Sequence, residues 1–140
     1  MIELEGLTKD FGSLRAVDGI NLQIPRGEFF AVLGPNAAGK TTTIKMMVGL
    51  IRPTAGRARI AGFDIQENPL EARSRLSYVP DFPFLYEKLT PAEFLRFTGR
   101  LFRMPDAQIR EECDELVPRF NLEDWLHQPI ESLSHGTRQR

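Results

Sequence analysis

The sequence predicts an α/β fold with a β-containing core over residues 1–84 and a helical subdomain over residues 85–140. Short segments of alternating apolar and polar residues, and an apolar segment that ends in a glycine-rich loop, indicate the first part. Helical periodicity and a capping box indicate the second. The net charge of −1 argues against a nucleic-acid partner, because such surfaces need clustered Lys and Arg.

The expected elements of the first part follow from periodicity. Residues 2–7 alternate apolar side chains with glutamates, which predicts a half-buried strand, and residues 16–24 predict a second. Residues 29–33 are apolar on both faces, as in a central parallel strand. Residues 40–50 have helical spacing. The remaining expected elements are a strand over 57–65, a short helix over 69–76 and a strand over 76–79.

Two helices are expected in the second part. Thr90-Pro91-Ala92-Glu93 is a capping box with proline at the first helical position, and its helix should run to about residue 103. Residues 105–120 predict an amphipathic helix capped by Asp106. We expect Trp125 and the apolar residues at 94, 95, 101 and 102 to form the core of this subdomain.

The composition favours a cytoplasmic domain. No apolar segment is long enough for a membrane span, and the N-terminus does not have a signal-peptide pattern. A single cysteine, Cys113, excludes an intrachain disulfide, and the acidic residues around it should raise its pKa.

Residues 34–41, Gly-Pro-Asn-Ala-Ala-Gly-Lys-Thr, match the phosphate-binding motif G-x-x-x-x-G-K-[ST]. Backbone N–H groups of such a loop converge on a polyphosphate, and the following helix adds the positive end of its dipole. The alternative is a glycine-bearing turn that a lysine happens to follow. The expected phosphate-binding residues are Gly34, Pro35, Asn36, Ala37, Ala38, Gly39, Lys40, Thr41 and Thr42.

Three further segments resemble motifs of the ABC transporter ATPases. Residues 133–140, Leu-Ser-His-Gly-Thr-Arg-Gln-Arg, resemble the signature motif, and residues 76–81 resemble the strand that leads into the Q-loop. Phe11-Gly12 with residues 16–20 is similar to the A-loop and the strand after it. The resemblance implies a P-loop NTPase fold of the ABC ATPase type, with a small antiparallel β subdomain and an α-helical subdomain.

The resemblance also implies how ATP and Mg²⁺ would be held. Phe11 would stack on adenine with Val17 packed nearby, although Phe11 could instead be a core aromatic residue. Thr41 would ligate Mg²⁺, and Asp81 would contact Mg²⁺ or water, or remain a solvated carboxylate. Asp81 is shorter than the usual Gln or Glu. Ala37 replaces a glycine, so a positive φ there would be strained.

Two kinds of partner are implied by the same resemblance. Ser134 and Gly136 would contact the γ-phosphate of a nucleotide held by a second, head-to-tail subunit; His135 replaces a glycine between them. A membrane permease would place the protein at the cytoplasmic face of the membrane. Its docking residues would be Phe82, Phe84, Leu85 and Tyr86, which could equally pack locally on the following helix.

Later motifs of the family, the Walker B aspartate, the catalytic glutamate and the switch histidine, do not occur in these 140 residues. We therefore expect a part of an ABC ATPase that ends at the signature motif, has no catalytic residue and binds nucleotide without turnover. Residues 132–140 should be loosely held or rearranged. The uncovered edge at residues 29–33 should make the chain associate, swap elements with another copy or bind a partner along that edge.

Other functions remain open on the sequence. They are an ABC-type ATPase without a permease, a P-loop small-molecule kinase, and a non-catalytic P-loop interaction module.

Overall fold

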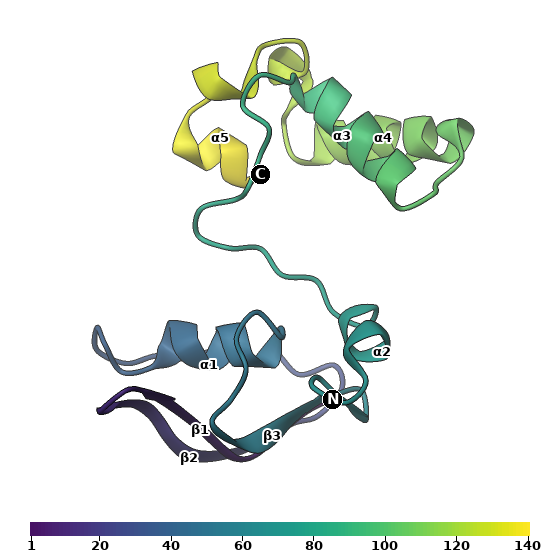
Figure 1. Ribbon diagram of the computed structural model, residues 1–140. Coiled ribbons are helices and arrows are strands. Elements are labelled where there is room, and N and C mark those ends of the chain that lie inside the picture. The colour runs from purple at the N-terminus through teal and green to yellow at the C-terminus, as the bar shows by residue number, and fades with distance from the viewer. The chain divides into compact units, whose positions relative to one another are not determined.

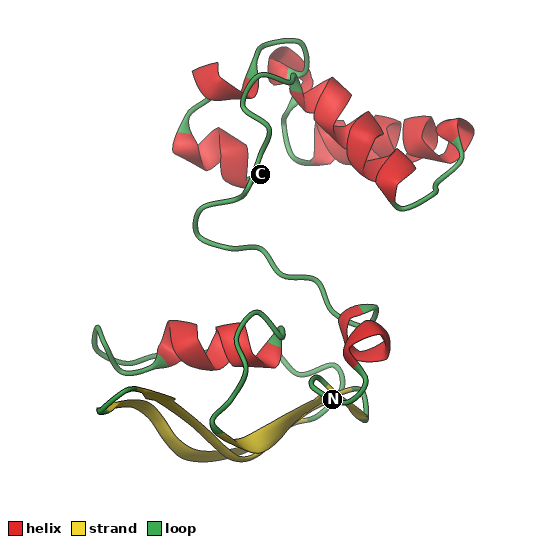
Figure 2. Cartoon of the chain, viewed as in Figure 1, coloured by secondary structure: helices red, strands yellow, loops and turns green.

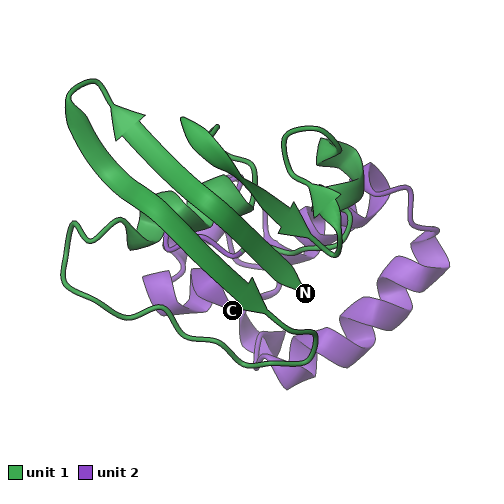
Figure 3. Cartoon of the chain, turned by 90° about the horizontal axis from the view of Figure 1, so that it is seen from below, with its two compact units in different colours: residues 1–78 green, residues 79–140 purple.

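The computed structural model describes all of residues 1–140 and divides them into two compact units, Met1–Tyr78 and Val79–Arg140 (Figure 3). The sequence places this division at residues 84 and 85. Strands occur only in the first unit, and the second is built of helices and connecting turns (Figure 2).

A four-stranded antiparallel sheet with the order β2-β1-β3-β4 forms the base of the first unit. β1 is central, and Ile2 pairs with Ile24 on one side and with Ile60 on the other. Leu4, Leu7 and Thr8 of β1 are buried, and register shifts after Leu4 interrupt the simple alternation of its side chains. The strands are β1 (Ile2–Phe11), β2 (Leu14–Ile24), β3 (Ala55–Ile60) and β4 (Phe63–Asp64).

Helix α1 (Lys40–Met47) lies over this sheet (Figure 1). Met46 of α1 is fully buried, and the short helix α2 (Pro69–Arg73) adds Ala72 to the same core. Arg73 also donates to the Gly49 carbonyl at 2.7 Å, which ties α2 to the turn after α1. The buried core residues are Leu4, Leu7, Val17, Met46, Ala58, Ile60, Ile65 and Ala72.

The expected strand at residues 29–33 is wrong for this structure. The segment has no strand pairing, and Phe29 and Leu33 are 96% and 90% exposed. A strand needs a neighbour to satisfy its backbone N–H and C=O groups, and the four strands of the sheet pair only with one another. The strand expected at residues 76–79 is absent for the same reason.

The second unit contains α3 (Pro91–Leu101), α4 (Asp106–Arg119) and α5 (His135–Gln139), with 3₁₀ turns at Glu123–Trp125 and Ile130–Ser132. The predicted capping box is confirmed: Thr90 Oγ1 accepts from the Glu93 N–H, and the Glu93 carboxylate accepts from the Thr90 N–H. α3 and α4 approach closely at Gly99, where a Cβ would lie 2.6 Å from Ile109 Cγ1.

Two expectations for this unit are wrong. Asp106 does not cap α4, because it is the first helical residue and its carboxylate accepts from Arg100 at 2.9 and 3.0 Å. Leu101 and Phe102, at the C-terminal end of α3, and Trp125, in a 3₁₀ turn, are exposed rather than core. The buried apolar residues of the unit are Ile109, Val117, Ile130 and Leu133.

Residues 135–139 form α5 instead of a rearranged segment. Ser134 is its N-cap and accepts from the Thr137 N–H at 3.2 Å. Arg138 donates to the carbonyls of Leu133 at 3.0 Å and Glu131 at 2.7 Å. These side-chain bonds hold a helix that is too short to be stable by propensity alone.

Candidate functional site

The loop at residues 34–39 joins the exposed apolar segment to α1, and Gly39 sets its position. Gly39 is the N-cap of α1 and has a φ of +82°, in the left-handed region that favours glycine. A Cβ at Gly39 would also lie 2.4 Å from the carbonyl oxygen of Ala16 in β2. Both the conformation and the close approach therefore require glycine, and the loop rests directly on β2.

The loop presents backbone donors to solvent. The Ala38 N–H donates to the Pro35 carbonyl at 3.3 Å, but the N–H groups of Asn36, Ala37 and Gly39 have no backbone partner. The first three N–H groups of α1 have no side-chain cap, and no acidic residue lies in its first turn. Unpaired donors and the positive end of a helix dipole fit an anionic group at this position.

Lys40 supplies the one side-chain cation of the loop. Its Nζ donates to the carbonyls of Gly34 at 2.8 Å and Pro35 at 2.7 Å, so the ammonium lies against the loop. Thr41 is exposed at the start of α1, and Thr42 is half-buried. Thr43 turns inward and donates to the Gly39 carbonyl at 3.0 Å. The three threonines therefore face different surroundings, and Thr41 is the one most open to a ligand.

Ala37 has a φ of +65°, which confirms the positive φ considered from the sequence. For a residue with a Cβ, this conformation is strained. Ala37 is not packed against other residues, since residues 34–38 are all exposed.

The turn between β1 and β2 lies at the same end of the first unit as the loop before α1 (Figure 1). Phe11 ends β1, pairs with Leu14 and is 50% exposed. Val17 is only 4% exposed and would contact a Cβ at Gly39 at 3.1 Å, so it supports the loop from within the core. Sequence analysis does not single out Lys9, whose Nζ lies 5.1 Å from the centroid of the Phe11 ring.

The predicted signature residues and Asp81 belong to the second unit. Ser134 Oγ lies 2.8 Å from Thr137 Oγ1 and caps α5, while Gly136 lies in its first turn with open space where a Cβ would be. Asp81 is exposed, and its backbone carbonyl accepts from Gln139 Nε2 at 2.7 Å.

The aromatic segment of the second unit packs in part on its own helices. Tyr86 contacts Phe94 and Phe97 of α3, with an edge-to-face geometry at Phe97. Phe82 lies 5.4 Å from the His135 ring, whereas Phe84 is 95% exposed. Leu85, which is half-buried, lines an apolar pocket beside α5.

Three other features concern the lone thiol, metal binding and membrane spans. Burial raises the pKa of the Cys113 thiol, and Asp114 adds to this effect, so burial rather than the acidic neighbours is the main cause. No group of three His, Cys, Asp or Glu side chains is placed to hold a metal ion. No helix has the length and apolar character of a membrane span.

Comparison with known proteins decides the family, because the ABC transporter family model matches residues 17–140. The chain belongs to the ABC transporter family. Two curated members of this family are similar to it. The Nod factor export ATP-binding protein I of Ralstonia nicotianae is 39% identical over 140 residues, which are 100% of this chain and 44% of that protein. The daunorubicin/doxorubicin resistance ATP-binding protein DrrA of Streptomyces peucetius is 40% identical over 139 residues, or 99% of this chain and 42% of that protein.

A solved ABC structure has the same fold. A dimeric ATP-binding cassette in a post-hydrolysis state, bound to ADP and Pi, superposes with a TM-score of 0.82 at 25% identity. The match covers 99% of this chain and 65% of that one. The predicted fold class, a P-loop ABC ATPase with a small antiparallel sheet and a helical subdomain, is therefore confirmed. The chain spans less than half the length of the two curated ABC relatives.

Proposed function

We propose that this chain is the nucleotide-binding part of an ATP-binding subunit of an ABC transporter, and that residues 34–42 hold Mg·ATP. The observation that carries the proposal is the loop fixed on β2 by Gly39, with unpaired N–H groups and no acidic residue in the first turn of α1. Such a site favours a polyphosphate over a neutral ligand.

Lys40 and Thr41 would contact the triphosphate and its metal ion. On binding, the Lys40 ammonium exchanges the carbonyls of Gly34 and Pro35 for β- and γ-phosphate oxygens. Thr41, exposed at the start of α1, offers its hydroxyl to Mg²⁺. Bound Mg²⁺ would neutralise part of the phosphate charge.

Phe11 would stack on the adenine ring. Its half-exposed ring ends β1, and Val17, three residues past its partner Leu14, supports Gly39. Val17 would support the nucleotide from below, through the loop.

In the whole protein, the site would work in a head-to-tail dimer attached to a permease. Ser134 and Gly136, at the start of α5, would face the γ-phosphate of the partner's nucleotide. Exposed Phe84, with Phe82, Leu85 and Tyr86, would dock a permease helix at the cytoplasmic face of the membrane. The relatives are named for Nod factor export and for daunorubicin/doxorubicin resistance, which favours export as the process.

Within these 140 residues we propose nucleotide binding without turnover. Hydrolysis needs a positioned water and further Mg²⁺ ligands. Asp81 is the one residue expected to contribute to either, and its carboxylate is short for that role. Measurable ATP hydrolysis by the purified chain would contradict this part of the proposal.

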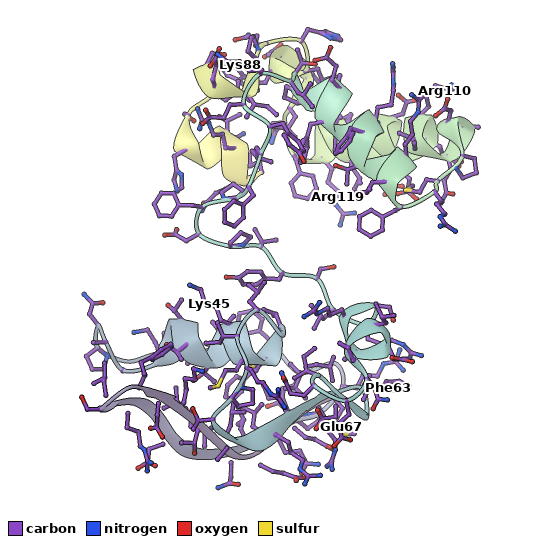
Figure 4. All side chains as sticks on the ribbon, in the orientation of Figure 1. Lys45, Phe63, Glu67, Lys88, Arg110 and Arg119 are labelled. Atoms are coloured by element: carbon purple, nitrogen blue, oxygen red, sulfur yellow. The ribbon has the colours of Figure 1, made fainter.

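Calorimetric titration of Mg·ATP into the purified chain and its Lys40→Ala variant tests the nucleotide site. Losing a charge-assisted contact of about 1.5–3 kcal/mol should weaken binding by about 10-fold to 100-fold. Lys45→Ala is the matched control, because Lys45 is an exposed lysine of the same helix (Figure 4) and should bind as the parent does. Equal affinity of the Lys40→Ala variant and the parent would favour a non-catalytic interaction module instead.

A further inference from the structure

Lys9 and Phe11 form a cation–π pair at the end of β1. The Lys9 Nζ lies over the ring at 5.1 Å from its centroid and donates to the Arg52 carbonyl at 2.7 Å. Lys9 is half-buried, whereas half of the Phe11 surface is open to solvent. The cation therefore occupies one side of the ring and leaves accessible aromatic surface.

The backbone on both sides of Lys9 is fixed to the turn that follows α1. The Thr54 N–H donates to the Thr8 carbonyl at 2.9 Å, and the Asp10 N–H donates to Thr54 Oγ1 at 3.0 Å. Together with the bond from Lys9 to Arg52, these contacts hold the strand end at three points. The ammonium is thus positioned by the fold and does not sample the solvent freely.

No carboxylate forms an ion pair with Lys9. The neighbouring carboxylate, Asp10, accepts from Arg15 at 2.9 and 3.3 Å, and this contact is the main reason that the pKa of Asp10 is lowered. Arg15 also reaches Asp18 at 3.0 Å. Arg15 takes the direct contacts of these acids, so the Lys9 ammonium contacts the Phe11 ring and the Arg52 carbonyl and acts on Asp10 only through a weaker Coulombic interaction.

We propose that Lys9 is a positioning residue for a purine base stacked on Phe11; this rests on the proposed nucleotide site. The cation attracts the negative face of the ring and fixes its orientation. It also draws π density from the opposite face, which reduces repulsion toward an electron-rich purine stacked there. The arrangement would be cation, ring and base in succession, so Lys9 acts on the nucleotide only through Phe11.

A purely structural role makes a different prediction. If Lys9 served only to tie β1 to the turn at residues 52–54, its loss would disturb the whole first unit, including the phosphate loop. Binding of inorganic tripolyphosphate, which has the phosphates and no base, would then weaken as much as binding of ATP. The two ligands therefore separate support of the base from support of the fold.

The test is calorimetric titration of Mg·ATP and Mg·tripolyphosphate into the parent, Lys9→Met, Lys9→Arg and the control Lys45→Met. Lys9→Met should weaken ATP binding by about 3-fold to 10-fold and leave tripolyphosphate binding unchanged. Lys9→Arg keeps a cation over the ring and should restore ATP affinity. Lys45 points away from the sheet (Figure 4), so its variant should match the parent for both ligands.

A double-mutant cycle with Phe11→Leu completes the test. In the Phe11→Leu background the ring is gone, so Lys9→Met should cause no further loss of ATP affinity. Additive losses, or equal weakening of ATP and tripolyphosphate by Lys9→Met, would overturn the role of Lys9 while leaving the phosphate site intact. Failure of the parent to bind either ligand would instead overturn the proposed function, and this inference with it.

Discussion

Ala37 is the residue at which the phosphate loop holds backbone strain. Its φ of +65° places a Cβ in the left-handed region, two residues before Gly39, which adopts a similar φ without a side chain. The left-handed conformation costs a residue with a Cβ about 1–2 kcal/mol. The neighbouring Ala38 has no positive φ. The two alanines are both exposed, and they differ in backbone strain.

Ala37→Gly should therefore stabilise the protein. Relief of the strain exceeds the chain entropy of about 0.4–1 kcal/mol that glycine adds to the unfolded state, which leaves a net gain of about 0.5–1 kcal/mol. Ala38→Gly gains no relief and should destabilise by about that entropy alone. Urea unfolding of both variants, with unchanged slopes, gives the comparison. Equal losses of stability for both variants would show that Ala37 does not hold this conformation in solution.

Much of the loop could be predicted at this scale, and its side-chain contacts could not. The local sequence motif determines the backbone conformation of the loop. It therefore predicts the roles of Gly39 and Lys40 and the positive φ of Ala37. The contact between Lys9 and Phe11 depends on the Arg52 carbonyl, 43 positions along the chain, which fixes the ammonium. A lysine two residues before an aromatic residue in a strand was the available signal, but it is too common to single out Lys9.

At the scale of the element, helix α3 was predictable and the start of α4 was not. The Thr90 capping box is a local signal and forms as expected. Aspartate is a residue type that suits an N-cap. The Asp106 carboxylate instead accepts two charge-assisted hydrogen bonds from Arg100 of α3, at 2.9 and 3.0 Å. A partner on another helix therefore decides the role of Asp106, and helical periodicity does not reveal that partner.

The Arg100–Asp106 bond predicts a pH-dependent link between α3 and α4. The hydrogen bonds and the charge of Arg100 hold the pKa of the Asp106 carboxyl below its usual range. A lowered pKa adds stability above about pH 4, where the unfolded carboxyl is ionised, and that stability is lost as the pH falls through the folded pKa. The free energy of unfolding should thus be higher for the parent than for Asp106→Asn at pH 7, and the difference should shrink toward pH 3.

Asp114→Asn is the control on the same helix, because Asp114 has no ion pair and is exposed. Its difference from the parent should not follow the same fall with pH. Denaturant titrations at several pH values measure both differences. A gap between the parent and Asp106→Asn that stays constant from pH 7 to pH 3 would contradict the ionic link.

At the scale of the whole molecule, local sequence patterns predicted which segments suit a β-strand better than they predicted which segments pair in the sheet. β1 and β2 form where alternation predicts strands, because each finds a partner along the sheet. The single strand expected over residues 57–65 is instead two strands, β3 and β4, which are joined by a turn at Ala61 and Gly62, both with positive φ. Residues 29–33 have an equally strong apolar pattern and remain unpaired. An apolar groove of about 670 Å³ lies beside them, lined by Phe30, Val32, Leu33 and Met47. Periodicity indicates that a segment suits a buried strand, but only tertiary structure supplies the neighbour.

This unpaired segment predicts self-association of the chain. Five consecutive uncharged residues of mostly high β-propensity, with free backbone N–H and C=O groups, can pair with the same segment of a second copy. Leu33→Lys places a charge in the segment and should shift the chain toward monomer in light scattering after size-exclusion chromatography.

Leu70→Lys is the matched control, because Leu70 is also exposed, at 79% against 90% for Leu33, but lies on α2. If association runs through residues 29–33, only Leu33→Lys reduces it and the amides of this segment gain hydrogen-exchange protection with rising protein concentration. A parent chain that is monomeric at every concentration, or equal shifts from the two leucine variants, would show that this edge does not mediate pairing.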